Sequence, residues 1–267
     1  MNLTTIDLVA AGAAAFAAGA VNALAGGGTL ISFPVLVAIG VPALPANITN
    51  TVALCPGYLS GTLAQRSDLV PQWARTKRLS VAALLGGVAG SILLDVTPNR
   101  TFRVAVPWLI LLSCALLLAQ DRVRDWVRSR TEARHEASTS AGGENTSVHR
   151  DPPVGLMIVV FVAAIYGGFF GAGLGIMLLA LLGLFSDDSL THLNALKQAL
   201  SLVINLAAAV LFALTGHVRW ELVPIMAVAG LLGGGVGGRL SRVVNPTALR
   251  VGVVVFGVAV AVRFLIN

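Results

Sequence analysis

Apolar segments long enough to suggest membrane helices follow one another along the whole chain, five in each half. In the first half they cover residues 6–25, 29–44, 48–65, 79–94 and 102–119, and in the second half residues 154–171, 174–185, 193–215, 222–238 and 249–266. A helix needs about 20 residues to cross roughly 30 Å of hydrocarbon, so the second segment of each half is short for a crossing. The pattern predicts an all-α polytopic membrane protein whose second segments are short or broken.

The two halves are related in sequence. Asn47 and Asn194, Trp73 and Trp220, and Arg103 and Arg250 are each 147 positions apart, and several glycines coincide at the same offset. A duplicated, apolar chain interrupted by glycine is typical of a secondary transporter built from two structural repeats. We expect residues 1–120 and 154–267 to form the two membrane repeats.

The segment between the repeats, residues 121–153, has a different composition. Of the 30 charged residues in the chain, 12 lie between Asp121 and Asp151, mixed with Ser, Thr, Gly and Pro. Such a sequence buries too little apolar surface to order itself. Its first part, up to Arg134, is compatible with an extension of the preceding helix, and we expect the remainder to be a flexible linker.

The distribution of Lys and Arg predicts the orientation. If each half crosses the membrane five times, 14 basic residues lie on the side of the linker and 4 on the other side; four crossings give 12 against 6. Cytoplasmic loops carry the excess of basic residues, so five crossings are favoured and the linker is expected in the cytoplasm. An odd number of crossings makes the second repeat inverted relative to the first.

Composition agrees with a membrane protein. The chain is 56% hydrophobic and 11% charged, with a mean hydropathy of +0.86, whereas a soluble domain carries about 25% charged residues. The excess of Lys and Arg over Asp and Glu therefore reports the orientation of the loops and does not indicate nucleic-acid binding. Residues 1–7 lack the basic region of a cleavable signal peptide, so the first apolar segment is expected to be retained. Cys55 and Cys114 lie in apolar runs and predict neither a disulfide framework nor a metal site.

Two glycine-rich turns precede the short segments. They comprise Gly26, Gly27, Gly28 and Thr29 in the first half, and Gly171, Gly173 and Gly175 with the interposed Ala172 and Leu174 in the second. Glycine lets the backbone leave helical geometry, and the helix that restarts presents up to four unpaired N–H groups, which suit an anion. Close helix packing is the alternative explanation for glycine, and we expect it for Gly86 with Gly90, Gly233 with Gly237, and Gly234 with Gly238.

Polar residues inside the apolar segments are the second signal, because each is costly there without a partner or a function. They are Asn22, Asn47, Asn50, Asn194, Lys197 and Asn205. Helix capping is an alternative for Asn47 and Asn194, and snorkelling to the surface is one for Lys197. Outside the linker, each Asp and Glu falls at a segment end or in a loop, so the candidate site has a cation and amides but no carboxylate. Such a site suits an anion. The sequence contains no nucleophile motif, phosphate-binding loop or metal-ligand spacing, so neither catalysis nor a cofactor is expected.

At these residues the chain resembles the sulfite exporter TauE/SafE family of bacterial membrane permeases. The resemblance is carried by Gly19 through Asn22, the triple glycine and Pro34, by the stretch LAQRSDLVPQW after Asn47, and by NALKQALSLVINLAAAVLFALTGHVRW in the second half. It implies a permease for a small anion, such as sulfite, a sulfonate or sulfoacetate, in the bacterial inner membrane. The second turn departs from the plain triple glycine at Ala172 and Leu174. The expected partners are the anion and the lipid bilayer, with a homodimer left open; an anion channel and a membrane scaffold without transport activity are the alternative functions.

Overall fold

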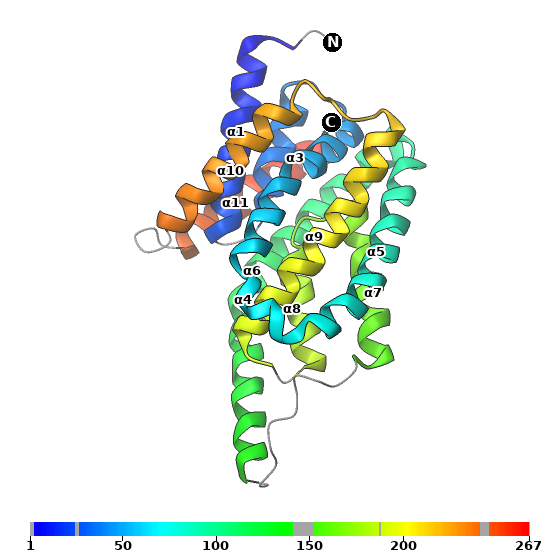
Figure 1. Cartoon of the computed structure of the whole chain (residues 1–267). Coiled ribbons are helices and arrows are strands. Elements are labelled where there is room, and N and C mark those ends of the chain that lie inside the picture. The colour runs from blue at the N-terminus through cyan, green and yellow to red at the C-terminus, as the bar shows by residue number, and fades with distance from the viewer. Residues whose placement is uncertain (1–2, 25–26, 141–151, 187, 241–245, 267) are drawn as a thin grey trace.

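The computed structural model describes residues 3–24, 27–140, 152–186, 188–240 and 246–266, and every regular element among them is a helix (Figure 1). The first half contains six α-helices and one short 3₁₀ turn. These are α1 (Thr5–Leu24), α2 (Thr29–Ala38), α3 (Ala43–Ala64), α4 (Arg66–Leu69), η1 (Val70–Gln72), α5 (Trp73–Asp95) and α6 (Asn99–Ser140). The second half contains α7 (Val154–Phe169), α8 (Leu174–Phe185), α9 (Leu190–Thr215), α10 (Val223–Leu240) and α11 (Pro246–Ile266).

Each predicted apolar segment corresponds to one helix, with two differences in extent. The segment expected at residues 29–44 ends as α2 at Ala38, because Gly40 has a φ of +92° and Pro42 caps a new helix that starts at Ala43. Helix α6 continues through the charged stretch to Ser140, beyond the Arg134 at which an extension was expected to end. The rest of the expected flexible linker falls mainly on residues 141–151, outside the described residues.

The second helix of each half is short, as predicted. Helices α2 and α8 have 10 and 12 residues, which corresponds to about 15 and 18 Å at the rise of an α-helix. Each follows a turn in which glycine takes a left-handed conformation, with φ values of +84° at Gly27, +75° at Gly171 and +78° at Gly173. These backbone angles are accessible to glycine at little cost, which explains why the chain breaks at these positions.

Among the described residues, five helical stretches are long and apolar enough to cross a membrane. They are Thr5–Asn22, Arg66–Asp95, Asn99–Arg130, Leu190–Thr215 and Ala248–Ile266. Large apolar side chains such as Leu84, Ile158 and Val210 are exposed on the outside of the bundle, where lipid rather than water would cover them. Helix α3 is absent from this group although it has 22 residues, because polar side chains lower its hydropathy.

Similar helix contacts occur in both parts of the bundle. Helix α1 packs on α10 and α7 packs on α5; likewise α3 contacts α10 and α9 contacts α5. Both the α1/α10 and the α5/α7 interface depend on glycine. A Cβ atom at Gly86 would lie 2.3 Å from the Phe161 carbonyl oxygen, one at Gly90 2.0 Å from that of Ile165, and one at Gly233 2.0 Å from that of Phe16. The predicted packing role of Gly86, Gly90 and Gly233 is thus confirmed, whereas the side-chain positions of residues 237–238 are not described.

Helices α3 and α9 run in opposite directions in Figure 1. Helix α3 descends toward α4, while α9 ascends from the same end of the bundle. Two contacts between the helices agree with this arrangement. The Cys55 thiol lies 3.4 Å from the Asn205 carbonyl oxygen, and the Thr62 hydroxyl lies 3.4 Å from the Gln198 carbonyl oxygen. Helices α3 and α9 are therefore antiparallel neighbours at the centre of the molecule.

Candidate functional site

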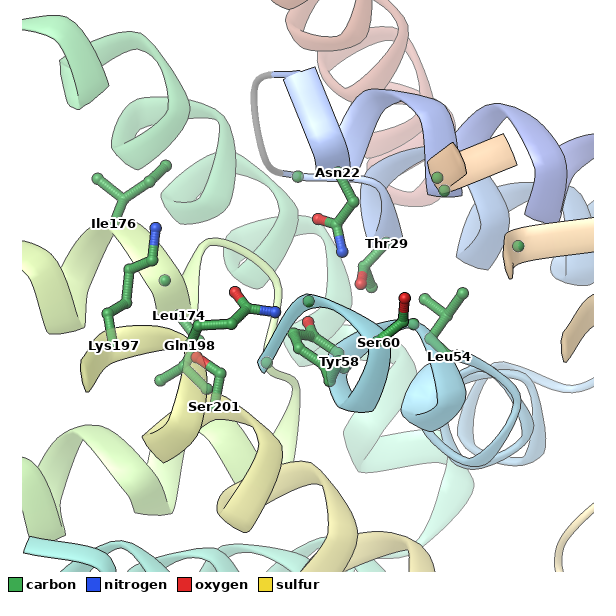
Figure 2. A pocket seen from close by; sticks show the side chains of 18 of the residues that line it. Asn22, Thr29, Leu54, Tyr58, Ser60, Leu174, Ile176, Lys197, Gln198 and Ser201 are labelled. Atoms are coloured by element: carbon green, nitrogen blue, oxygen red, sulfur yellow. The ribbon is translucent and has the colours of Figure 1, made fainter. Parts of the chain in front are cut away.

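A cavity of about 440 Å³ lies between the two halves of the chain. Its wall contains residues from α1, α3, α6, α8, α9 and α10, together with the two glycine turns. Eight of the residues predicted for the site line it: Asn22, Gly27, Thr29, Gly171, Gly173, Gly175, Asn194 and Lys197. Figure 2 shows Asn22 and Thr29 on one side of this space and Lys197 on the other.

The start of α8 forms part of the wall. The Leu174 N–H donates to the Gly171 carbonyl at 3.2 Å, and the Ile176 N–H donates to the Gly173 carbonyl at 3.0 Å. These bonds use two of the donors that were expected to be free. Within the described part of the chain, the N–H of Gly175 has no acceptor. The helix start therefore offers fewer free donors than the four predicted, although its partial positive charge still faces the cavity.

The start of α2 is held by a side chain of α1. The Asn22 side-chain oxygen accepts a hydrogen bond from the Gly28 N–H at 3.4 Å. Gly28 itself is buried and does not line the cavity; a Cβ atom there would lie 2.2 Å from the Ala18 carbonyl oxygen. The absence of a side chain at Gly28 thus permits the close approach of α1 to the turn. Gly26, also predicted for the site, lies outside the described residues.

Lys197 supplies a cation at the cavity wall. Its Nζ donates to the Asn194 side-chain oxygen at 2.6 Å, one helical turn earlier on α9. Its stem lies against the start of α8, where a Cβ atom at Gly175 would be 3.6 Å from the Lys197 Cδ. An ammonium group has three N–H donors, so two of them remain for other partners.

Arg124 is a second cation of the same wall, and the sequence analysis did not assign it to the site. It lies on α6, in the charged stretch that was expected to belong to the linker. None of the described residues that line the cavity is Asp or Glu. Two cations without a compensating carboxylate give the cavity a positive potential, which attracts anions.

Further polar residues of the wall were also missed. They are Tyr58, Ser60, Gln120, Gln198 and Ser201 on α3, α6 and α9, and Gln65 directly after α3. In Figure 2, Gln198 and Tyr58 extend toward one another across the cavity. Gly61 makes room for this arrangement, because a Cβ atom there would lie 2.4 Å from the Gln198 amide nitrogen. The available signal was the helical spacing of polar residues along the third segment of each half.

Besides Gly28, three predicted site residues lie outside the cavity lining. Asn47 and Asn50 on α3 are each 1% exposed, and Asn205 on α9 is 6% exposed. The Asn47 amide nitrogen donates to the Phe169 carbonyl at 3.0 Å, and the Asn205 amide nitrogen donates to the Ser201 carbonyl at 2.8 Å. The side-chain oxygen of Asn50 is buried and has no hydrogen-bond partner among the described residues.

Comparison with known proteins agrees with this geometry. The model of the family "Sulfite exporter TauE/SafE" matches residues 11–264, nearly the whole chain. The chain belongs to the TauE/SafE family. A "Probable membrane transporter protein" of Haemophilus influenzae is 27% identical over 241 residues, which cover 90% of this chain and 87% of that protein. The "Probable membrane transporter protein YfcA" of Escherichia coli is 24% identical over 251 residues, with coverages of 94% and 87%.

A third relative, the "Probable membrane transporter protein ORF9" of a Sinorhizobium species, is 23% identical over 252 residues, covering 94% of this chain and 90% of that protein. No solved structure gives a significant match. TauE/SafE membership and the names of these relatives indicate a membrane transporter. Together with the apolar helices, they identify this chain as a multi-pass protein of the bacterial inner membrane.

Proposed function

We propose that the protein is a secondary transporter that moves a small anion across the inner membrane by alternating access. The substrate class that we infer is sulfite, a sulfonate or a related sulfur-containing organic anion. The observation that carries the proposal is the composition of the cavity wall: Lys197 and Arg124, amide and hydroxyl groups, and the start of α8, without a described carboxylate. An oxyanion accepts several hydrogen bonds at once, and this wall consists largely of donors.

The arrangement of the polar groups supports a reversible site better than a tight one. The cavity, at about 440 Å³, is several times larger than a single small oxyanion. Water therefore accompanies the anion, and part of its hydration shell is retained. Charged groups that remain partly hydrated bind with moderate affinity, because each loses less solvation than in a dry site. Moderate affinity allows release on the opposite side.

The repeat architecture supports alternating access. Equivalent helices make equivalent contacts, α1 with α10 and α7 with α5, and the α3/α9 pair is antiparallel. We propose that the two repeats are inverted about an axis in the membrane plane, with the cytoplasm on the side of the segment that follows α6. Inverted repeats permit rigid-body rocking of one bundle against the other around a central site.

Reconstitution into liposomes tests the proposal. Purified protein should take up radiolabelled sulfite, or a sulfonate from a panel that includes taurine and sulfoacetate, with saturable kinetics and with counter-flow. The control for charge selectivity is the uptake of the soluble cation thiocholine, measured in the same liposomes in place of the anions. Uptake that rises linearly with concentration and shows no counter-flow would indicate a channel, and the absence of both binding and uptake for every anion would refute the proposal.

A further inference from the structure

The two cations of the cavity wall have little compensating charge around them. The Lys197 ammonium on α9 donates to the neutral Asn194 side chain. The Arg124 guanidinium on α6 forms no hydrogen bond or ion pair with a described residue. The two positive charges repel one another across the space that both of them line. A wall of this kind is therefore stabilised by the negative charge of a ligand.

The acid that could neutralise Arg124 is bound to another helix. Asp121 precedes Arg124 by one helical turn, a spacing at which side chains of opposite charge can pair. Its carboxylate instead accepts a hydrogen bond from the guanidinium of Arg250 on α11, whose side chain is only 6% exposed. Asp125 directly follows Arg124, but adjacent residues of a helix do not face one another. The charge of Asp121 is thus largely compensated by Arg250 and not by Arg124.

The described acid that precedes Lys197 most closely in the sequence is engaged in the same way. Asp188 lies two residues before the start of α9. Its carboxylate accepts a hydrogen bond from the Arg75 guanidinium on α5, and both side chains are less than 10% exposed. Arg75 also donates to the Ser186 hydroxyl. Two buried arginines of other helices therefore neutralise the acids near the cavity cations, and Lys197 and Arg124 keep their excess charge.

This excess charge discriminates between anions by their charge. Coulombic attraction is proportional to the product of the charges, so an anion with two negative charges gains about twice the attraction of a singly charged anion of the same shape. A zwitterion is disfavoured, because its ammonium group meets two cations and no described carboxylate of the wall. Lys197 is half-buried and Arg124 is exposed. Solvent and salt screen Lys197 less, so we expect Lys197 to contribute more to the discrimination.

We propose that Lys197 and Arg124 together select doubly charged anions over singly charged and zwitterionic ones. In this arrangement Arg250 is a positioning residue, because it keeps the Asp121 carboxylate from pairing with Arg124. The inference rests on the proposed transport function and narrows its substrate class to dianions, such as fully deprotonated sulfite or a sulfonate that carries a second acidic group. Taurine, whose sulfonate is accompanied by an ammonium group, is expected to be a poor ligand.

Sulfate and methanesulfonate test the inference, because they are similar in size and shape and differ by one charge. Calorimetry on detergent-purified protein at low ionic strength measures both dissociation constants. Sulfate should bind at least about tenfold more tightly than methanesulfonate, and the zwitterion aminomethanesulfonate should bind more weakly than either. Arg124→Met should reduce the preference for sulfate by about two- to fivefold, the range of an exposed charge pair. The double substitution Lys197→Met with Arg124→Met should abolish the preference.

The role of Arg250 is tested by loss and recovery. Arg250→Met releases the Asp121 carboxylate, so the preference for sulfate should fall as it does in Arg124→Met. Addition of Asp121→Asn to this variant should restore the preference, a recovery that a merely structural role of the ion pair would not produce. Arg128→Met is the matched control. It removes the same charge one turn further along α6, where Arg128 is exposed, pairs with Glu132 and lies outside the cavity lining, so the preference should equal that of the wild type.

Equal dissociation constants for sulfate and methanesulfonate in the wild type would overturn the inference while leaving the transport proposal intact. An unchanged preference in the variant that lacks both Lys197 and Arg124 would do the same, and this measurement is independent of whether Arg250→Met folds. A preference that stays low after Asp121→Asn is added to Arg250→Met would refute the positioning role of Arg250. Failure of the wild type to bind or transport any anion would overturn both proposals.

Discussion

The substitution Lys197→Met is the most direct test of an anion site in the cavity. Methionine keeps an unbranched stem that packs against the start of α8 near Gly175, and it deletes the ammonium group. The Nζ donates one hydrogen bond to Asn194 at 2.6 Å, which leaves two N–H groups that face other partners. The variant therefore removes donors from the cavity without changing the helix contacts.

The expected loss of affinity follows from these two donors. A hydrogen bond to a charged group contributes about 1.5–3 kcal/mol, and every 1.4 kcal/mol corresponds to about a tenfold change in the dissociation constant. If one donor contacts the anion, the dissociation constant rises about 10- to 150-fold. Arg124 remains in the wall, so the cavity keeps part of its positive potential and some binding persists at high anion concentration.

Calorimetry with sulfite on purified protein measures the dissociation constant, and uptake into liposomes measures the flux. The chain provides a matched control, since Lys77 is its only other lysine. Lys77 lies on α5 over the Trp73 ring, 5.4 Å from the ring centroid and away from the cavity. Lys77→Met removes the same charge from the protein and should leave binding unchanged. An affinity of Lys197→Met within about twofold of the wild type would refute the role of Lys197, because this difference is below the smallest contribution of such a bond.

Three further outcomes test the turns, the helix packing and the topology. Gly173→Val places a β-branched residue at a φ of +78° and brings a Cβ atom to 3.1 Å from the Leu116 side chain, so sulfite binding should be lost in protein that still elutes as a single species; wild-type affinity would show that the turn is not part of the site. Gly86→Ala brings a Cβ atom to 2.3 Å from the Phe161 carbonyl oxygen, so thermal unfolding should indicate a loss of about 1–3 kcal/mol with little change in affinity, and an unchanged unfolding temperature would contradict the tight packing of α5 on α7. In a background without Cys55 and Cys114, a membrane-impermeant thiol reagent should reach Ser129→Cys and Arg219→Cys from opposite sides of the membrane, and labelling of both from one side would reject the inverted arrangement.

The sequence predicted the helices well because each depends on a strong local signal. A run of apolar residues about as long as the hydrocarbon core has few alternatives to a helix, since the backbone must satisfy its own hydrogen bonds there. The positions of the breaks were equally predictable, because Gly27 and Gly173 occupy left-handed conformations that other residues rarely adopt. Similar patterns occur in both halves of the sequence, so most of these signals were present twice.

The length of α6 was less predictable, because its charged part resembles a linker in composition. The structure shows local interactions that favour the helix. Arg128 pairs with Glu132 one turn later at 2.9 Å, and the Arg130 guanidinium lies 5.3 Å from the centroid of the Trp126 ring. Such pairs stabilise a helix only slightly. The prediction therefore followed the linker-like composition of this stretch and did not extend the helix through it. The consequence was functional, since Arg124 was assigned to the linker although it lines the cavity.

The sequence did not predict that one of the basic residues counted in the loops is buried. Arg75 was counted among the basic residues of a loop, but it lies 9% exposed at the start of α5 and contacts Asp188 and Ser186 before α9. The counting rule treats every Lys and Arg near a helix end as solvated. A residue with a specific partner far away in the sequence, here more than one hundred positions, escapes any rule based on sequence proximity.

The two halves of the chain contribute differently to the cavity at positions that align in sequence. Asn47 and Asn194 are 147 positions apart in the sequence, yet Asn47 is buried and donates to the Phe169 carbonyl, whereas Asn194 lines the cavity and accepts from Lys197. Asn50 and Lys197 have the same separation, and Asn50 is buried whereas Lys197 lines the cavity. The repeated pattern therefore predicted polar residues in both halves but not which of them line the cavity, because that depends on the packing of helices that are distant in sequence.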